Sequence, residues 1–309
     1  MNKIRIPGIA NIFKVSQPEE IELLAQDSRI DRKFDLRTCP INWALLKRSL
    51  AVLSFEGRRF PTMTPRGVVQ RQTDQENLRN ALNERIGAIS AGPEELEPLA
   101  NWVRGVGDEQ QVGILAQQLL GRLFSRSFEA SQDSWAAAKV LVAAPRSWKL
   151  PTLVWWLVSG RIKQAKRLLA GMVDGNLSAV NAVGIAVHNV VKGMRHMRAL
   201  YADTAIRSSL LPGEAARQCL FAPVSLYRQA TEAGQLDGCP FSRNSLFVLE
   251  IGKASRRPGG LSLVFMDATW SGCPAAQWVP AMFEGVWRRA TLRLDRHSRE
   301  RRSPTEFRP

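Results

Sequence analysis

VFMDATWSGCPAA, residues 264–276, is a short loop-like run that holds one cysteine, Cys273, and a helical pattern follows it directly. Upstream, Glu214-Ala-Ala-Arg217 opens another helical stretch. Backbone N–H groups at the start of a helix stabilise a thiolate. Cys273 is therefore the first candidate for a functional side chain in this sequence.

The composition is ordinary for a globular protein apart from its charge. Among 309 residues, 43 Lys and Arg stand against 28 Asp and Glu, a formal net charge of +15. Such an excess predicts an acidic partner, namely a nucleic acid, an anionic membrane surface or an acidic protein. The 4 cysteines include no Cys-x-x-Cys pair, so a disulfide scaffold is excluded and a cytoplasmic location is expected. The longest uncharged span, 175–191, is too polar to cross a bilayer.

Helical periodicity dominates the pattern of apolar residues. It predicts helices over 73–89, 112–124 and 135–144, and Pro145 ends the last of them. Residues 225–230 and 245–250 instead have the pattern of strands, separated by a turn-rich segment. The expected fold class is mainly α with a small β element (α+β). We expect a single domain over 1–290 and a basic, disordered C-terminal tail over 291–309.

The layout of the sequence resembles that of a cytochrome P450, a heme-thiolate monooxygenase. The resemblance is carried by Glu214-Ala-Ala-Arg217, then Ala222-Pro-Val-Ser-Leu-Tyr-Arg-Gln-Ala230, then Leu236-Asp-Gly238 and residues 245–252. In that family a Glu-x-x-Arg helix is followed by a proline turn, an arginine-bearing strand and a hairpin. The similarity covers nearly the whole chain in shortened form, and it implies a truncated P450-like helical fold.

The resemblance implies a heme cofactor (iron protoporphyrin) held by Cys273 as the axial ligand of the iron. A thiolate ligand donates electron density to the iron and favours O–O cleavage. The resemblance also implies that Glu214 and Arg217 form a buried charge pair that braces the core beside the heme. Without the upstream motif, Cys273 would be interpreted as a small buried apolar residue.

Three further residues receive roles from the resemblance. Arg79, in a helix opened by Asp74-Gln-Glu-Asn, and Arg228, on the strand after the proline turn, align with arginines that contact the heme propionates. Asp174 lies near the start of a segment that resembles the long helix crossing the oxygen-binding face, and is a candidate for proton relay. Each of the three could equally be an ordinary packing or surface residue.

The cysteine loop departs from the family pattern. The pattern has Phe-Gly-x-Gly ahead of the ligand and a basic residue two places before it. Here Phe265 is one residue too early, Asp267 and Thr269 replace the glycines, and Ser271 replaces the base. The aromatic-proline segment expected before the loop is absent. These differences leave open whether heme binding and oxygen activation are retained.

Three functions follow as alternatives. The first is a heme-thiolate monooxygenase that oxidises a small apolar substrate with electrons from a ferredoxin-type partner, to which the net charge of +15 is suited. The second is a heme-thiolate enzyme with peroxide-driven or non-oxygenase chemistry. The third is a degenerate homologue without monooxygenase activity. Nucleic-acid binding is disfavoured because the basic residues are scattered.

Overall fold

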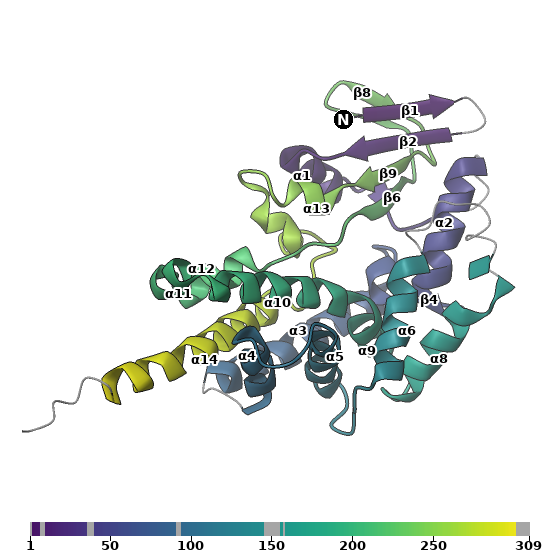
Figure 1. The fold of residues 1–309 in the computed structure, drawn as a ribbon. Coiled ribbons are helices and arrows are strands. Elements are labelled where there is room, and N and C mark those ends of the chain that lie inside the picture. Colours follow the sequence, from purple (N-terminus) through teal and green to yellow (C-terminus); the bar gives the residue numbers. More distant parts are fainter. Residues whose placement is uncertain are drawn as a thin grey trace, which may run out of the picture.

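Most of the helices gather in one part of the molecule, and the main sheet lies in another, together with α1 and α13 (Figure 1). The structure is a computed structural model, and it describes residues 2–6, 10–35, 40–90, 94–144, 155–156 and 158–300. Each part has its own apolar core, one among the helices and one between the sheet, α1 and α13. The predicted class, mainly α with a small β element, is confirmed.

The main sheet joins the two ends of the sequence. Its strand order is β1-β2-β9-β6-β3, and only β2 and β9 run parallel. Phe13 of β2 stacks on Phe247 of β9, with ring centroids 5.0 Å apart. The strands predicted at 225–230 and 245–250 are present as β6 and β9. The five strands are β1 (Asn2–Ile6), β2 (Ala10–Val15), β3 (Ile30–Asp31), β6 (Leu226–Ala230) and β9 (Leu246–Leu249).

Two small hairpins complete the β structure: β4 (Ser54–Phe55) with β5 (Arg58–Arg59), and β7 (Gly234–Leu236) with β8 (Cys239–Phe241). The α-helices are α1 (Pro18–Gln26), α2 (Pro40–Val52), α3 (Val69–Ser90), α4 (Glu97–Val103), α5 (Gln111–Arg122), α6 (Gln132–Ala143), α8 (Arg161–Gly171), α9 (Leu177–Asn181), α10 (Val187–Ala202), α11 (Thr204–Ser209), α12 (Pro212–Gln218), α13 (Ile251–Ala254) and α14 (Trp278–Glu300). None of the helices in the described ranges is both long and apolar enough to cross a bilayer.

α9 and α10 form one long helix that crosses the middle of the molecule (Figure 1). A short π-helical segment, η4 (Ala182–Ala186), joins them. The side chain of Asn176 caps the start, because it accepts hydrogen bonds from the backbone N–H groups of Ser178 and Ala179. π-Helical segments inside longer helices are frequent at functional sites.

α14 packs against α12 and closes the helical core with the buried side chains of Trp278, Phe283 and Trp287. It continues to Glu300 and so includes the first part of the predicted tail over 291–309. Residues 301–309 lie outside the described residues. The predicted domain boundary at 290 stays a prediction.

Gly193→Ala tests the close packing of α10. A Cβ at Gly193 would lie 2.3 Å from the ring of Phe283 and 2.4 Å from the backbone carbonyl oxygen of Cys219. A backbone oxygen cannot rotate away to relieve the clash as a side chain can, so we expect the free energy of unfolding to fall by about 2–3 kcal/mol. Gly87→Ala in α3, where a Cβ meets nothing within 4 Å, should be neutral or raise it by up to about 1 kcal/mol. Urea denaturation measures both, and equal effects would contradict the packing.

Candidate functional site

A cavity of about 900 Å³ lies among the helices and the loop that precedes α14. Its wall is formed by α3, by the long helix of α9, η4 and α10, and by residues between 263 and 275. Ligand cavities in proteins commonly measure about 300–1,000 Å³. This cavity is near the upper end of that range, as a ligand of cofactor size requires.

Cys273 lines this cavity. Its backbone N–H donates to the carbonyl oxygen of Phe265 over 2.8 Å, which closes residues 265–273 into a compact loop. Residues 274–277 form a turn between Cys273 and α14, so the cysteine does not sit directly on the helix as the sequence predicted. Burial raises the pKa of the Cys273 thiol, and the backbone N–H of Ala275 opposes that rise. A bound metal ion would favour the ionised thiolate over the thiol.

Three arginines from distant parts of the sequence are buried together beside the cavity. Arg32, Arg71 and Arg228 are 3%, 5% and 1% exposed. Arg32 follows β3, Arg71 lies near the start of α3, and Arg228 lies in β6. Arg32 and Arg71 line the cavity themselves, whereas Nη2 of Arg228 donates over 3.1 Å to Oγ of Ser271, which lines it.

Within the described ranges, no ion pair includes any of these three arginines. Burial is the main cause that lowers the pKa of each, and repulsion from neighbouring guanidinium groups lowers it further. The pKa of Arg32 falls well below its ordinary value, and that of Arg228 falls to about 10. Asp31 opposes these shifts, but its Oδ1 accepts the backbone N–H groups of Arg32 and Arg66. The Nε atoms of Arg32, Arg71 and Arg228 have no hydrogen-bond partner.

The indole ring of Trp270 is the centre of this group. The guanidinium carbons of Arg32, Arg66, Arg71 and Arg228 lie 5.0, 5.0, 4.7 and 5.6 Å from the centroid of its ring. A cation–π contact contributes about 0.5–2 kcal/mol. Burying a guanidinium costs several kcal/mol, so the indole offsets only part of that cost. We call Arg32, Arg66, Arg71, Arg228 and Trp270 the arginine cluster.

An anion at this edge of the cavity would supply the partners that the arginine cluster lacks. Heme carries two carboxylates on one edge of a flat macrocycle and an iron atom at its centre. The buried Nε donors of Arg32 and Arg71 match the carboxylates, and the Cys273 thiol matches the iron. The residues present therefore fit a heme.

Of the two arginines that the sequence assigned to propionates, the structure places only Arg228 in the arginine cluster. Arg79 lies outside the cavity wall, is 39% exposed at its side chain, and pairs with Asp267 over 3.5 Å. The face of α3 that meets the cavity instead carries Arg71, Gln75, Leu78 and Leu82. Arg71 lies one helical turn before Gln75 on that face, and this spacing could have identified it from the sequence.

The long helix contributes amide side chains to the cavity wall. Asn181 and Asn189 line the cavity on either side of η4, and Oδ1 of Asn181 is buried without a hydrogen-bond partner. Asp174 lies before this helix, in the turn after α8, with φ of 51° and an exposed side chain. Asp174 does not line the cavity, although its neighbour Gly175 does. Its relay role stays a prediction.

The predicted buried charge pair of Glu214 and Arg217 needs correction. Both residues lie in α12, but none of the ion pairs in the described part of the chain joins them, and Arg217 is exposed. Oε2 of Glu214 accepts the backbone N–H of Leu211 over 3.3 Å and so caps the helix. Arg217 has nothing buried to pair with, because its face of α12 meets solvent.

Solved structures with the same arrangement identify the fold. CYP175A1 from Thermus thermophilus superposes with a TM-score of 0.62 at 15% identity, over 93% of this chain and 83% of that chain. The fold is that of a cytochrome P450. The cytochrome P450 PksS of the Bacillus subtilis 168 bacillaene polyketide synthase superposes with a TM-score of 0.55 at 11% identity, over 93% of this chain and 84% of that chain. P450BioI, in complex with an acyl carrier protein ligated to hexadec-9Z-enoic acid, superposes with a TM-score of 0.54 at 12% identity, over 95% of this chain and 86% of that chain.

No protein-family model matches the sequence, and no curated protein matches it significantly. The P450-like fold is thus visible in the three-dimensional structure and in a few motifs, while overall sequence similarity is low. In this fold the cavity that holds Cys273 and the arginine cluster is the candidate site for the cofactor.

Arg71→Met tests whether the arginine cluster is a ligand site. In cofactor-free protein the substitution removes a buried charge and one hydrogen bond to the Trp270 carbonyl oxygen, so we expect the free energy of unfolding to stay level or rise by about 1 kcal/mol. Heme affinity should fall at least about tenfold, because a hydrogen bond to a charged group contributes about 1.5–3 kcal/mol. Urea denaturation at neutral pH and hemin titration followed at the Soret band measure the two effects.

Arg243→Met, at an exposed arginine outside the cavity wall, is the matched control and should change neither quantity. A loss of stability in Arg71→Met with unchanged heme affinity would show that Arg71 has a structural role only.

Proposed function

We propose that the protein is a heme-thiolate oxidoreductase of the cytochrome P450 type, a monooxygenase that oxidises a small apolar substrate. One observation carries the proposal: a group of buried arginines without acidic partners lies at the edge of a cofactor-sized cavity that Cys273 also lines. The P450-like fold supports it, because that fold supplies a cavity of this kind between a long helix and a cysteine loop.

Cys273 would hold the iron of the heme through its sulfur. Its thiol is protonated in the buried environment of the cofactor-free protein, and it would lose its proton on binding iron. The backbone N–H of Ala275 then donates to the sulfur and stabilises the negative charge. Bound there, heme would supply redox chemistry with oxygen, and a thiolate ligand favours O–O cleavage.

Arg32, Arg71 and Arg228 would bind the propionates. Their guanidinium groups are already buried and fixed by hydrogen bonds to Pro61, Trp270 and Ser271. A carboxylate therefore meets donors that need no further ordering, which is a favourable condition for binding. Arg79, on the outer side of α3, would act on this site only through its pair with Asp267 in the cysteine loop.

Electrons would come from a ferredoxin-type partner. The net charge of +15 supports an acidic protein as that partner. The substrate would occupy the part of the cavity where apolar side chains such as Ile185, Val190 and Phe124 line the wall. This lining favours an apolar substrate.

The first test is the difference spectrum of the reduced protein with and without carbon monoxide, after reconstitution with hemin. We expect the red-shifted Soret band that a thiolate ligand produces, and its loss in Cys273→Ala. Cys239→Ala, at a half-exposed cysteine outside the cavity, is the matched control and should keep the band. Failure to bind heme at all would refute the proposal, and an unshifted band would mean that another residue ligates the iron.

Proton delivery has two candidates, Asp174 before the long helix and Asn181 within it. A residue that moves or orients a proton should lower substrate oxidation by about 10² when removed. We expect Asp174→Asn to lower the product formed per electron consumed if Asp174 relays protons, and Asn181→Ala to do so if the amide orients a water molecule. Asp133→Asn, at an exposed aspartate on α6, is the control. An unchanged ratio in Asp174→Asn would exclude Asp174.

A further inference from the structure

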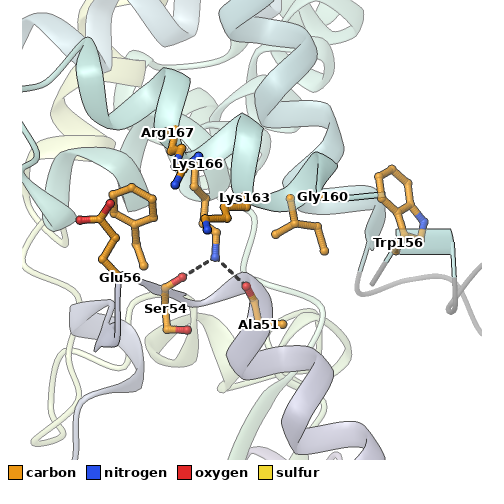
Figure 2. Close-up of a pocket in the computed structure, with 10 residues that line it drawn as sticks. Ala51, Ser54, Glu56, Trp156, Gly160, Lys163, Lys166 and Arg167 are labelled. Carbon is orange, nitrogen blue, oxygen red and sulfur yellow. Dashed lines mark hydrogen bonds between the residues drawn. The ribbon is translucent and has the colours of Figure 1, made fainter. Parts of the chain in front are cut away.

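A second cavity, of about 520 Å³, lies between α8 and the segment that connects α2 to the β4–β5 hairpin (Figure 2). Apolar side chains of Phe55, Trp156 and Ile162 form part of its wall. Lys166 of α8 points into the space between the two elements, toward the carbonyl groups of Ala51 and Ser54 (Figure 2). None of the residues proposed above to bind heme lines this cavity.

Lys166 is a buried cation with an unassigned hydrogen-bond donor. Its side chain belongs to a residue that is 6% exposed. Nζ donates to the carbonyl oxygen of Ala51 over 2.6 Å and to that of Ser54. A lysine ammonium has three N–H donors, so one donor remains for a ligand in the cavity.

Positive charge dominates the wall of this small cavity. Lys163, Lys166 and Arg167, all on α8, line it, and Glu56 is the one acidic residue among the described residues of its lining. Lys163 and Arg167 are exposed, so they contribute charge at the mouth of the cavity while Lys166 contributes it inside. A cavity with apolar walls and a buried cation is complementary to a small molecule that has an apolar body and an anionic group.

The electrostatics of Lys166 agree with this geometry. Desolvation by burial lowers the pKa of Lys166 to about 8, and no acidic residue opposes that shift. An anion beside Nζ would favour the charged form and raise this pKa again. By linkage, such an anion binds the protonated protein more tightly than the neutral one.

Segment 51–59 separates this cavity from the large one. Ala51, Ser54, Phe55 and Glu56 line the small cavity, whereas Leu53, Arg58 and Arg59 line the large cavity. One short stretch of backbone is therefore the shared wall of both. The bonds from Lys166 to Ala51 and Ser54 hold this wall against α8.

We propose that the small cavity is a second binding site, which takes a small apolar carboxylate, and that Lys166 binds the carboxylate. The ligand would occupy the free donor of Lys166, with Phe55, Trp156 and Ile162 around its apolar body. Bound there, it fixes segment 51–59 and thereby the wall of the large cavity. The binding half of this inference does not depend on heme.

Calorimetric titration of the cofactor-free protein tests this site, with benzoate as probe and benzamide as its neutral counterpart. We expect benzoate to bind and quench Trp156, with benzamide at least tenfold weaker. Lys166→Met should lower the affinity for benzoate at least tenfold. Arg71→Met should leave benzoate affinity unchanged. This result would distinguish the small cavity from the arginine cluster, where a carboxylate could also bind. Trp156→Phe should remove the fluorescence change.

The pH dependence has a definite sign. Lys166 is protonated below a pH of about 8, so benzoate affinity should be constant on the acid side and fall about tenfold between pH 7 and pH 9.5. Glu56, Lys163 and Arg167 are the other charged groups of the cavity wall. A constant affinity over this range would show that Lys166 does not bind the carboxylate.

A second variant separates ligand binding from folding, since loss of the two backbone contacts in Lys166→Met could disturb the fold. The double variant Lys163→Met, Arg167→Met keeps those contacts and removes two exposed cations. We expect it to lower the affinity for benzoate less, by about threefold. Equal binding of benzoate and benzamide, or binding abolished by Arg71→Met, would overturn the proposal. Either result leaves the heme proposal untouched, because no step of this test requires heme.

Discussion

The buried arginines are the constraint on which the rest of the site depends. Arg32, Arg71 and Arg228 are almost fully shielded from water and have no carboxylate partner among the described residues. Backbone carbonyl groups and the Trp270 ring supply part of the hydrogen bonding and charge stabilisation that these guanidinium groups need. Loss of water through burial nevertheless remains the largest influence on their pKa values, which are lowered. In the proposed function, an anionic ligand in the adjoining cavity would offset this cost.

The arginine cluster also explains how the altered cysteine loop can keep its shape. Ser271 stands where the resemblance expects a base, and its hydroxyl accepts a hydrogen bond from Arg228. Arg71 binds the Trp270 carbonyl oxygen, and Gln75 donates to that of Gly272. Cations from β6 and α3 thus replace the base that the loop lacks, and the same contacts fix the loop that presents Cys273.

Local patterns in the sequence predicted the fold class and the strands at 225–230 and 245–250. They also selected Cys273, which lines the large cavity, and Arg228, which lies beside it, and the roles of both stay predictions. They missed Arg32, because it meets Trp270 only through long-range packing of β3, and Arg71, although its helical spacing to Gln75 was visible in the sequence. Arg79 was chosen by motif alignment, yet the helical face that meets the cavity carries Arg71 and Gln75. The expected pairing of Glu214 with Arg217 failed because the spacing of a motif does not specify which face of α12 is buried.

The two cavities share a wall, because segment 51–59 contributes lining residues to each. Any ligand that holds Ser54 and Ala51 against Lys166 also restricts Leu53 and Arg59, and Nη1 of Arg59 donates to the carbonyl oxygen of Arg32 in the arginine cluster. A continuous chain of contacts therefore leads from Lys166 to the proposed cofactor site. Coupling between binding sites is reciprocal, so a carboxylate in the small cavity that changed heme affinity would have its own affinity changed by heme by the same factor.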